Sequence, residues 1–303
     1  MLLTAFIWGV AFVAQSVGME YIGPFSFNGA RFLMGSLVLL PLIYVRRKSS
    51  FKSGISGKAD DWQRYKDKEK NIPRTDFKVT LTGGVCCGLA LCSAALCQQI
   101  GIMYTTVGKA GFITTLYIVI VPIIGVFLGK KAGKKIWTGA GLAAVGMYLL
   151  CMSERLTLGR GDTYVFICAV LFSIHILVID YFSPKVDGVE LSCIQFLTAG
   201  VISSVLALVF EKPELQNFID GIIPLAYAGI MSCGVAYTLQ VVGQKNMDPT
   251  VASLILSMES VFSVLAGWVI LGQALSIREL FGCMMVFGAV ILVQLPDRKS
   301  SKI

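Results

Sequence analysis

Residues 5–42 read AFIWGVAFVAQSVGMEYIGPFSFNGARFLMGSLVLLPL. Two long apolar runs are separated here by a short polar break that contains Glu20 and ends at Pro24. A helix needs about 20 apolar residues to cross a bilayer. The stretch therefore predicts two membrane-spanning helices, 1–18 and 24–45, joined by a tight connection.

Similar runs recur along the whole chain of 303 residues, of which 55% are hydrophobic and 15% charged. Soluble domains carry about 25% charged residues. A segment that crosses lipid alone must satisfy its own backbone polar groups, so each run is expected to be a helix. The sequence predicts an all-α integral membrane protein with ten transmembrane helices: 1–18, 24–45, 79–100, 106–128, 134–152, 161–182, 190–210, 220–243, 249–271 and 277–295.

The positive charges predict how the chain is oriented in the membrane. Of 26 Lys and Arg, only Arg31 and Lys109 lie more than two residues inside a predicted span; 20 lie in or beside the even-numbered breaks and tail, and 4 in or beside the odd-numbered breaks. Positive loops remain in the cytoplasm. We expect a multi-pass protein of the plasma membrane with both termini cytoplasmic and a flexible cytoplasmic loop at 46–78. This placement also argues against nucleic acid as a partner, despite the net charge of +8.

The spans fall into an internal repeat. A shift of 164 places the first two spans on the sixth and seventh, and a shift of 142 places the third and fourth on the eighth and ninth, so that Gln98 meets Gln240. The fifth span meets the tenth at a shift of 143. Two five-helix halves, 1–152 and 160–296, would insert with opposite orientation, as in many secondary transporters with a site between inverted repeats.

Residues 5–42 and 254–292 carry a family resemblance that extends over nearly the whole chain. Trp8-Gly9, Arg31-Phe32 and Glu259-Ser260-Val261 resemble motifs of the EamA-like permeases of the drug/metabolite transporter superfamily. The family's acidic residues after the fourth and ninth spans are replaced by Lys130 and Gln273. The resemblance implies two five-helix repeats that export a small metabolite, such as an amino acid or a related compound.

Glu259 is the main candidate site residue, because a carboxyl at the centre of a span costs about 2.5–3.5 kcal/mol. Helical spacing places it on one polar arc with Ser257 and three other serines, 253, 260 and 263, and we expect this arc to face a water-filled cavity. Tyr117 lies at the matching depth of the fourth span. Glu259 either binds a substrate amine or carries a coupling proton, or it is a structural carboxyl between helices.

The other candidates are polar or aromatic side chains within spans. Trp8, Gln98, Gln240 and Tyr237 are expected either to line the cavity or to bridge helices. His175 is the only histidine, and hydrogen bonding to a neighbouring helix is favoured over a proton relay. Arg31 either holds a carboxylate or pairs with Glu20 near the outer end, and helix pairing is favoured.

The sequence disfavours a membrane enzyme as an alternative to a transporter. One histidine cannot complete the H-E-x-x-H motif of a membrane metalloprotease, and the loops leave no room for a catalytic domain. We therefore expect no enzyme activity, no cofactor and no metal site. The expected partners are the lipid bilayer, a small-molecule substrate and protons as a candidate coupling ion, with the chain a monomer or a homodimer. A membrane channel or a sensor is the alternative.

Overall fold

The computed structural model describes residues 1–53, 77–105, 107–129, 133–151, 159–271 and 276–295. Within these ranges the chain is helical with no strand, so the prediction of an all-α fold is confirmed. The helices are α1 (Leu2–Gly18), α2 (Pro24–Ser53), α4 (Phe77–Ile102), α5 (Val107–Thr115), α6 (Tyr117–Phe127), α7 (Lys134–Cys151), α8 (Arg160–Phe182), α9 (Gly188–Phe210), α10 (Leu215–Asp220), α11 (Ile222–Ala226), the π-helix η1 (Tyr227–Tyr237), α12 (Thr238–Gln244), α13 (Pro249–Leu256), α14 (Met258–Leu271) and α15 (Ile277–Gln294).

Seven helical stretches are long and apolar enough to cross a membrane. They are Pro24–Lys48, Phe77–Ile102, Ala110–Phe127, Arg160–Phe182, Gly188–Phe210, Ile222–Gln244 and Pro249–Ile270. The remaining predicted spans, 1–18, 134–152 and 277–295, are also helical but are not among these seven; α1 and the apolar part of α15 are shorter.

One sequence expectation about a loop is wrong. Helix α2 continues to Ser53, so the first part of the expected loop 46–78 is helical, because the charged residues after the apolar run extend the helix beyond it. The predicted spans 106–128 and 249–271 each contain a one-residue interruption of the α-helical pattern, at Leu116 and at Ser257, where the backbone stays in the right-handed helical region. Most of the loop, residues 54–76, lies outside the described residues, as do Lys130 and Gln273.

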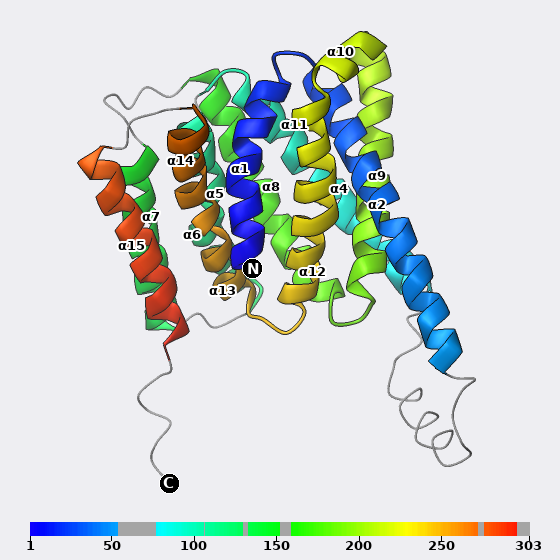
Figure 1. Ribbon diagram of the computed structural model, residues 1–303. Coiled ribbons are helices and arrows are strands. Elements are labelled where there is room, and N and C mark those ends of the chain that lie inside the picture. The colour runs from blue at the N-terminus through cyan, green and yellow to red at the C-terminus, as the bar shows by residue number, and fades with distance from the viewer. Residues whose placement is uncertain (54–76, 106, 130–132, 152–158, 272–275, 296–303) are drawn as a thin grey trace, which may run out of the picture.

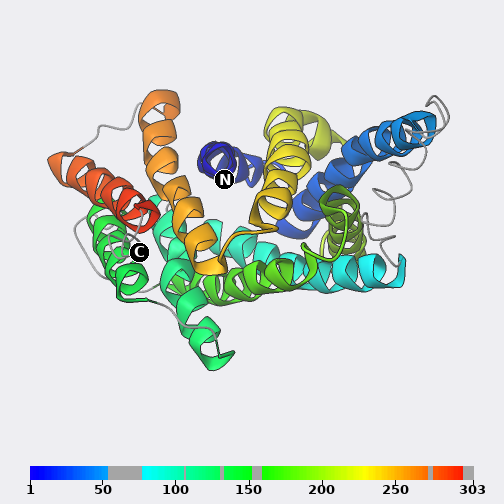
Figure 2. The same cartoon turned by 90° about the horizontal axis from the view of Figure 1, so that it is seen from below.

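The long helices stand side by side, and α10 lies across one end of the bundle (Figure 1). Met1 and the C-terminal end of α15 lie at the same end (Figure 1). Helices α7 and α15 pack against each other at one side of the molecule, and α2, which packs against α9, lies at the opposite side (Figure 2). Helix α1 lies between these two pairs.

Aspartates fix where three helices of the second half begin. The Asp187 carboxylate accepts from the N–H groups of Val189 and Glu190 at the start of α9, at 2.9 and 3.1 Å. Asp248 accepts in the same way at the start of α13, where Pro249 needs no donor partner. Asp162 caps α8 through the Gly159 N–H, at 2.9 Å. Each cap satisfies donors that the helix itself leaves free.

Glycines allow the closest helix contacts. A Cβ at Gly84 of α4 would lie 2.4 Å from the Ile194 side chain of α9, and one at Gly88 would lie 2.6 Å from Thr198. A Cβ at Gly9 of α1 would lie 2.8 Å from the backbone of α14 at Phe262. A residue with a side chain would clash at these distances. These glycines therefore determine how closely the central helices approach one another.

Candidate binding cavity

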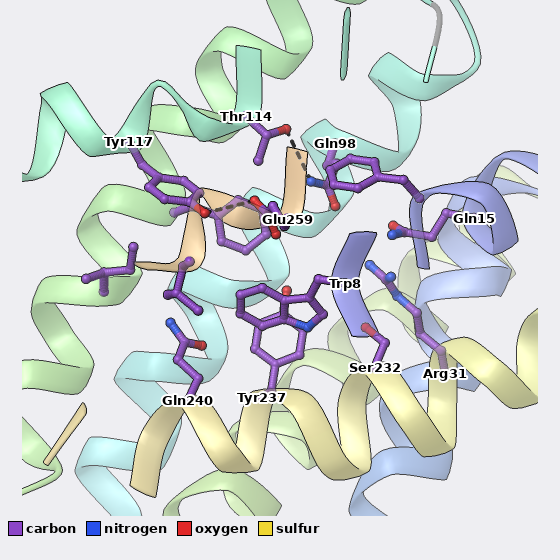
Figure 3. Close-up of a pocket in the computed structure, with 14 residues that line it drawn as sticks. Trp8, Gln15, Arg31, Gln98, Thr114, Tyr117, Ser232, Tyr237, Gln240 and Glu259 are labelled. Carbon is purple, nitrogen blue, oxygen red and sulfur yellow. Dashed lines mark hydrogen bonds between the residues drawn. The ribbon is translucent and has the colours of Figure 1, made fainter. Parts of the chain in front are cut away.

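A cavity lies among the central helices (Figure 3). Side chains from α1, α2, α4, α5, α6, α8, η1, α12, α13 and α14 line it, whereas the α7–α15 pair and α9 contribute none. The lining residues are Trp8, Phe12, Gln15, Arg31, Gln98, Thr114, Tyr117, Phe172, Ile176, Ser232, Tyr237, Gln240, Leu256 and Glu259. The wall thus combines aromatic side chains with a few buried polar groups, as small-molecule sites commonly do.

Most of the residues singled out from the sequence meet at this cavity. Seven of the nine line it: Trp8, Arg31, Gln98, Tyr117, Tyr237, Gln240 and Glu259. They come from segments up to about 250 residues apart in the chain, and no local pattern connects them. Their common feature was only that each is polar or aromatic within an apolar span.

Glu259 and Tyr117 contact each other directly. The Tyr117 hydroxyl donates to the Glu259 carboxylate at 2.9 Å, and both residues are buried, with exposed fractions of 3% and 4% (Figure 3). Tyr117 is the first residue of α6, directly after the interruption at Leu116, and Glu259 follows the interruption at Ser257 by two residues. The segments that follow these two one-residue interruptions therefore meet at one hydrogen bond.

Aromatic rings form the middle of the wall. The rings of Trp8 and Tyr237 are tilted by 57° with centroids 4.5 Å apart. The indole Nε1 of Trp8 is buried and has no hydrogen-bond partner among the described residues. Phe12 and Phe172 complete this apolar part of the lining. This part of the wall therefore combines aromatic surface with a buried N–H donor that has no partner among the described residues.

Arg31 is buried, with an exposed fraction of 1%. Its guanidinium carbon lies 4.9 Å from the centroid of the Phe32 ring and 5.8 Å from that of Phe27. No ion pair joins it to Glu20, which is exposed, so the favoured prediction of pairing with Glu20 is wrong. The reason is that Arg31 points inward to the cavity, whereas Glu20 lies in the connection after α1 (Figure 3).

The two repeat-related amides both face the cavity. The Gln98 amide nitrogen donates to the Thr114 hydroxyl at 3.3 Å. The amide oxygen of Gln240 is buried without a partner among the described residues. The Gln240 side chain therefore holds an unpaired acceptor at the cavity wall.

His175 and Ser257 do not line the cavity. The His175 imidazole Nε2 lies 3.1 Å from the Gln195 amide oxygen on α9, in line with the favoured prediction of a hydrogen bond to a neighbouring helix. The Ser257 hydroxyl donates to the Leu254 carbonyl at 2.7 Å. Ser253 and Ser260 bond to their own helix in the same way. The expected serine arc is therefore absent from the cavity wall: three of its hydroxyls bond to the preceding turn, and that of Ser263 is buried without a partner among the described residues.

Gln15, Thr114 and Ser232 also line the cavity and were missed from the sequence. Gln15 carried a usable signal, since it is an amide within the apolar run of the first span. Thr114 and Ser232 carried none, because small hydroxyl residues are common in membrane helices. Thr114 lies two residues before the interruption at Leu116, and Ser232 lies within the π-helix η1.

Comparison with known proteins gives one consistent match. The model of the EamA-like transporter family matches residues 1–152 and again residues 159–295. An uncharacterized transporter of Archaeoglobus fulgidus is 29% identical over 97% of this chain and 84% of its own length. The uncharacterized transporter YoaV of Bacillus subtilis is 19% identical over 92% of this chain and 90% of its own. One solved crystal structure shares the fold, with a TM-score of 0.68 and 16% identity over 96% of both chains.

Proposed function

Because this chain belongs to the EamA-like transporter family, we propose that it is a secondary transporter of a small metabolite, such as an amino acid or a related compound. Two halves, 1–152 and 160–296, would each cross the membrane five times in opposite orientation. Rocking of one half against the other would open the cavity to each side in turn. The substrate leaves chemically unchanged, so no enzymatic step is involved.

The composition of the cavity wall is the observation that carries this proposal. Seven of its lining residues, from Trp8 to Tyr117, belong to the first half, and seven, from Phe172 to Glu259, belong to the second. The family model also matches the two halves separately. A site shared equally between two halves changes its shape and access when the halves move, which is the requirement of alternating access.

The positions of the chain ends support the proposed topology. Met1 and the end of α15 lie at one end of the bundle, as an even number of crossings requires (Figure 1). The 20-to-4 bias of Lys and Arg assigns that end to the cytoplasm. We place the protein in the plasma membrane as a monomer or homodimer in which each chain holds its own cavity.

We propose that Glu259 carries the coupling proton. Its carboxyl lines the cavity, and a charged carboxyl at this depth is costly unless water or a ligand reaches it. Opening the cavity to one side would let water take the proton or deliver it. The Tyr117 hydroxyl, 2.9 Å away, would keep the carboxyl oriented toward the cavity in both forms.

Transport by purified protein in proteoliposomes tests this role. With a proton gradient imposed, Glu259→Gln should lose gradient-driven accumulation while exchange of substrate across the membrane persists. Glu20→Gln is the matched control, because Glu20 is exposed and does not line the cavity, and it should behave as wild type. Gradient-driven accumulation by Glu259→Gln at the wild-type rate, across pH, would overturn the proton-coupling role.

A further inference from the structure

Arg31 is a buried cation without an anionic partner. Its side chain lines the cavity, its residue is 1% exposed, and no ion pair to it occurs among the described residues. Its Nε and Nη2 atoms have no hydrogen-bond partner there either. An uncompensated charge within a membrane protein is strongly unfavourable, so a partner for this group is expected from outside the described side chains.

The aromatic rings beside Arg31 do not replace an anionic hydrogen-bond partner. Phe32 and Phe27 lie 4.9 and 5.8 Å from the guanidinium carbon, distances at which a ring stabilises a cation. A ring accepts no conventional hydrogen bond from the in-plane N–H donors, however. The rings therefore hold the guanidinium in place and leave its donors for something else.

Among the residues that the structure describes, no carboxylate lies within ion-pair distance of Arg31. Figure 3 shows Gln15 and Ser232 on either side of the guanidinium, whereas Glu259 lies across the cavity at its hydrogen bond to Tyr117. The amide oxygen of Gln15 is itself without a partner among the described residues. An oxyanion beside Arg31 would find the guanidinium and the hydroxyl of Ser232 as donors.

We propose that Arg31 binds an oxyanion of the transported substrate, so that the substrate class is a small organic anion with a planar apolar part. The inference rests on the proposed function, and it adds what the substrate must present. The carboxylate or phosphate lies at Arg31, where planar N–H pairs suit two oxygens. The apolar part lies against the rings of Trp8 and Tyr237, whose centroids are 4.5 Å apart.

Binding of simple probes to the wild-type protein in nanodiscs tests the subsite without any mutation. Benzoate, phenyl phosphate, benzamide and benzylamine share one ring and differ in charge and in the oxyanion. A ligand that binds the folded state raises the unfolding temperature with increasing concentration. We expect benzoate or phenyl phosphate to stabilise the protein and benzamide and benzylamine to have no effect. Whichever of the two anions binds more tightly indicates whether the substrate group is a carboxylate or a phosphate.

Variants at Arg31 assign the effect to this residue. Arg31→Gln should weaken binding of the preferred anion about 10- to 100-fold, the usual cost of losing a charge-assisted hydrogen bond. Arg31→Lys should retain part of the affinity, since it keeps the charge and loses the planar fork. Arg278→Gln is the matched control, because Arg278 is exposed on α15 beside the Tyr148 ring, away from the cavity, and it should bind as wild type.

Two results would overturn the subsite. One is equal stabilisation by benzamide and by both anions, and the other is unchanged anion affinity in Arg31→Gln. Because these measurements involve no transport, they separate the two proposals. A protein that transports a neutral metabolite but shows no preference for an anion would contradict the Arg31 subsite and leave the transporter function in place.

Discussion

At the scale of single residues, Gly9 shows how packing and the cavity depend on each other. It follows the cavity residue Trp8 on α1, and a Cβ at position 9 would lie 2.5 Å from the Phe262 Cβ and 2.8 Å from the backbone of α14. Backbone atoms cannot move aside as a flexible side chain can. Gly9 therefore allows α1 to approach the helix that carries Glu259.

We expect Gly9→Ala to destabilise the protein by about 1–3 kcal/mol, the usual cost of overpacking. It should also slow transport, because α1 and its Trp8 must move away from α14. Thermal unfolding in one detergent measures the first effect. Gly141→Ala is the control: nothing lies within 4 Å of the added Cβ on α7, so it should be neutral or slightly stabilising. Equal effects of the two substitutions would contradict this account.

Residue chemistry explains which of the residues singled out from the sequence line the cavity. Large polar or aromatic side chains within apolar spans cannot satisfy themselves, so Glu259, Gln98 and Gln240 meet at the cavity. A serine satisfies its hydroxyl on its own helix, as Ser257 does on Leu254, and its direction cannot be predicted from spacing alone. Arg31 was assigned the wrong partner because its orientation depends on the packing of α2.

At the scale of helices, α2 and α9 are joined at both ends. At one end the Glu211 carboxylate accepts from the N–H groups of Phe25 and Ser26, at 2.9 and 2.8 Å, and from the Ser26 hydroxyl. At the other end Arg47 pairs with Glu190 at 2.7 Å. The Glu211 contact caps the start of α2 with a residue that directly follows α9. We therefore expect it to stabilise the protein more than the Arg47–Glu190 ion pair does.

Glu211→Gln should lower the free energy of unfolding by about 1.5–3 kcal/mol, because the amide replaces one charged acceptor with a donor facing N–H groups. Arg47→Gln removes an ion pair whose arginine is 68% exposed, and such pairs contribute about 0–1 kcal/mol. The free energies of unfolding of both variants, measured in the same detergent micelles, compare the contributions of the two contacts. A larger loss of stability in Arg47→Gln than in Glu211→Gln would contradict the expected order of the two contacts.

The interruptions of the helices at Leu116 and Ser257 could not be predicted from the sequence. Neither Leu116 nor Ser257 is a proline or glycine, the residues that usually mark a kink. The π-helical stretch Tyr227–Tyr237 likewise follows from packing, with Gly229 against Met34 and Gly234 against Val38 of α2. Irregular turns of this kind often occur at functional sites, and here they place Tyr117, Glu259 and Tyr237 at the cavity.

At the scale of the whole molecule, apolar length predicted the all-helical fold and charge placement predicted that both ends lie on one side, because lipid leaves few alternatives for backbone and charge. The ten crossings and the inverted repeat remain predictions. The cavity was foreseen only as lying between two halves. Its wall required the helix packing, since the α7–α15 pair and α9 contribute no residue to it.

The most direct test of the transporter proposal is counterflow of a metabolite library into proteoliposomes that hold the wild-type protein, with membrane current recorded in parallel. We predict that at least one small organic metabolite exchanges saturably, emerges chemically unchanged and produces no current beyond that of a coupled proton. Flux that rises linearly with concentration and is accompanied by a large ionic conductance would contradict alternating access and identify a channel instead.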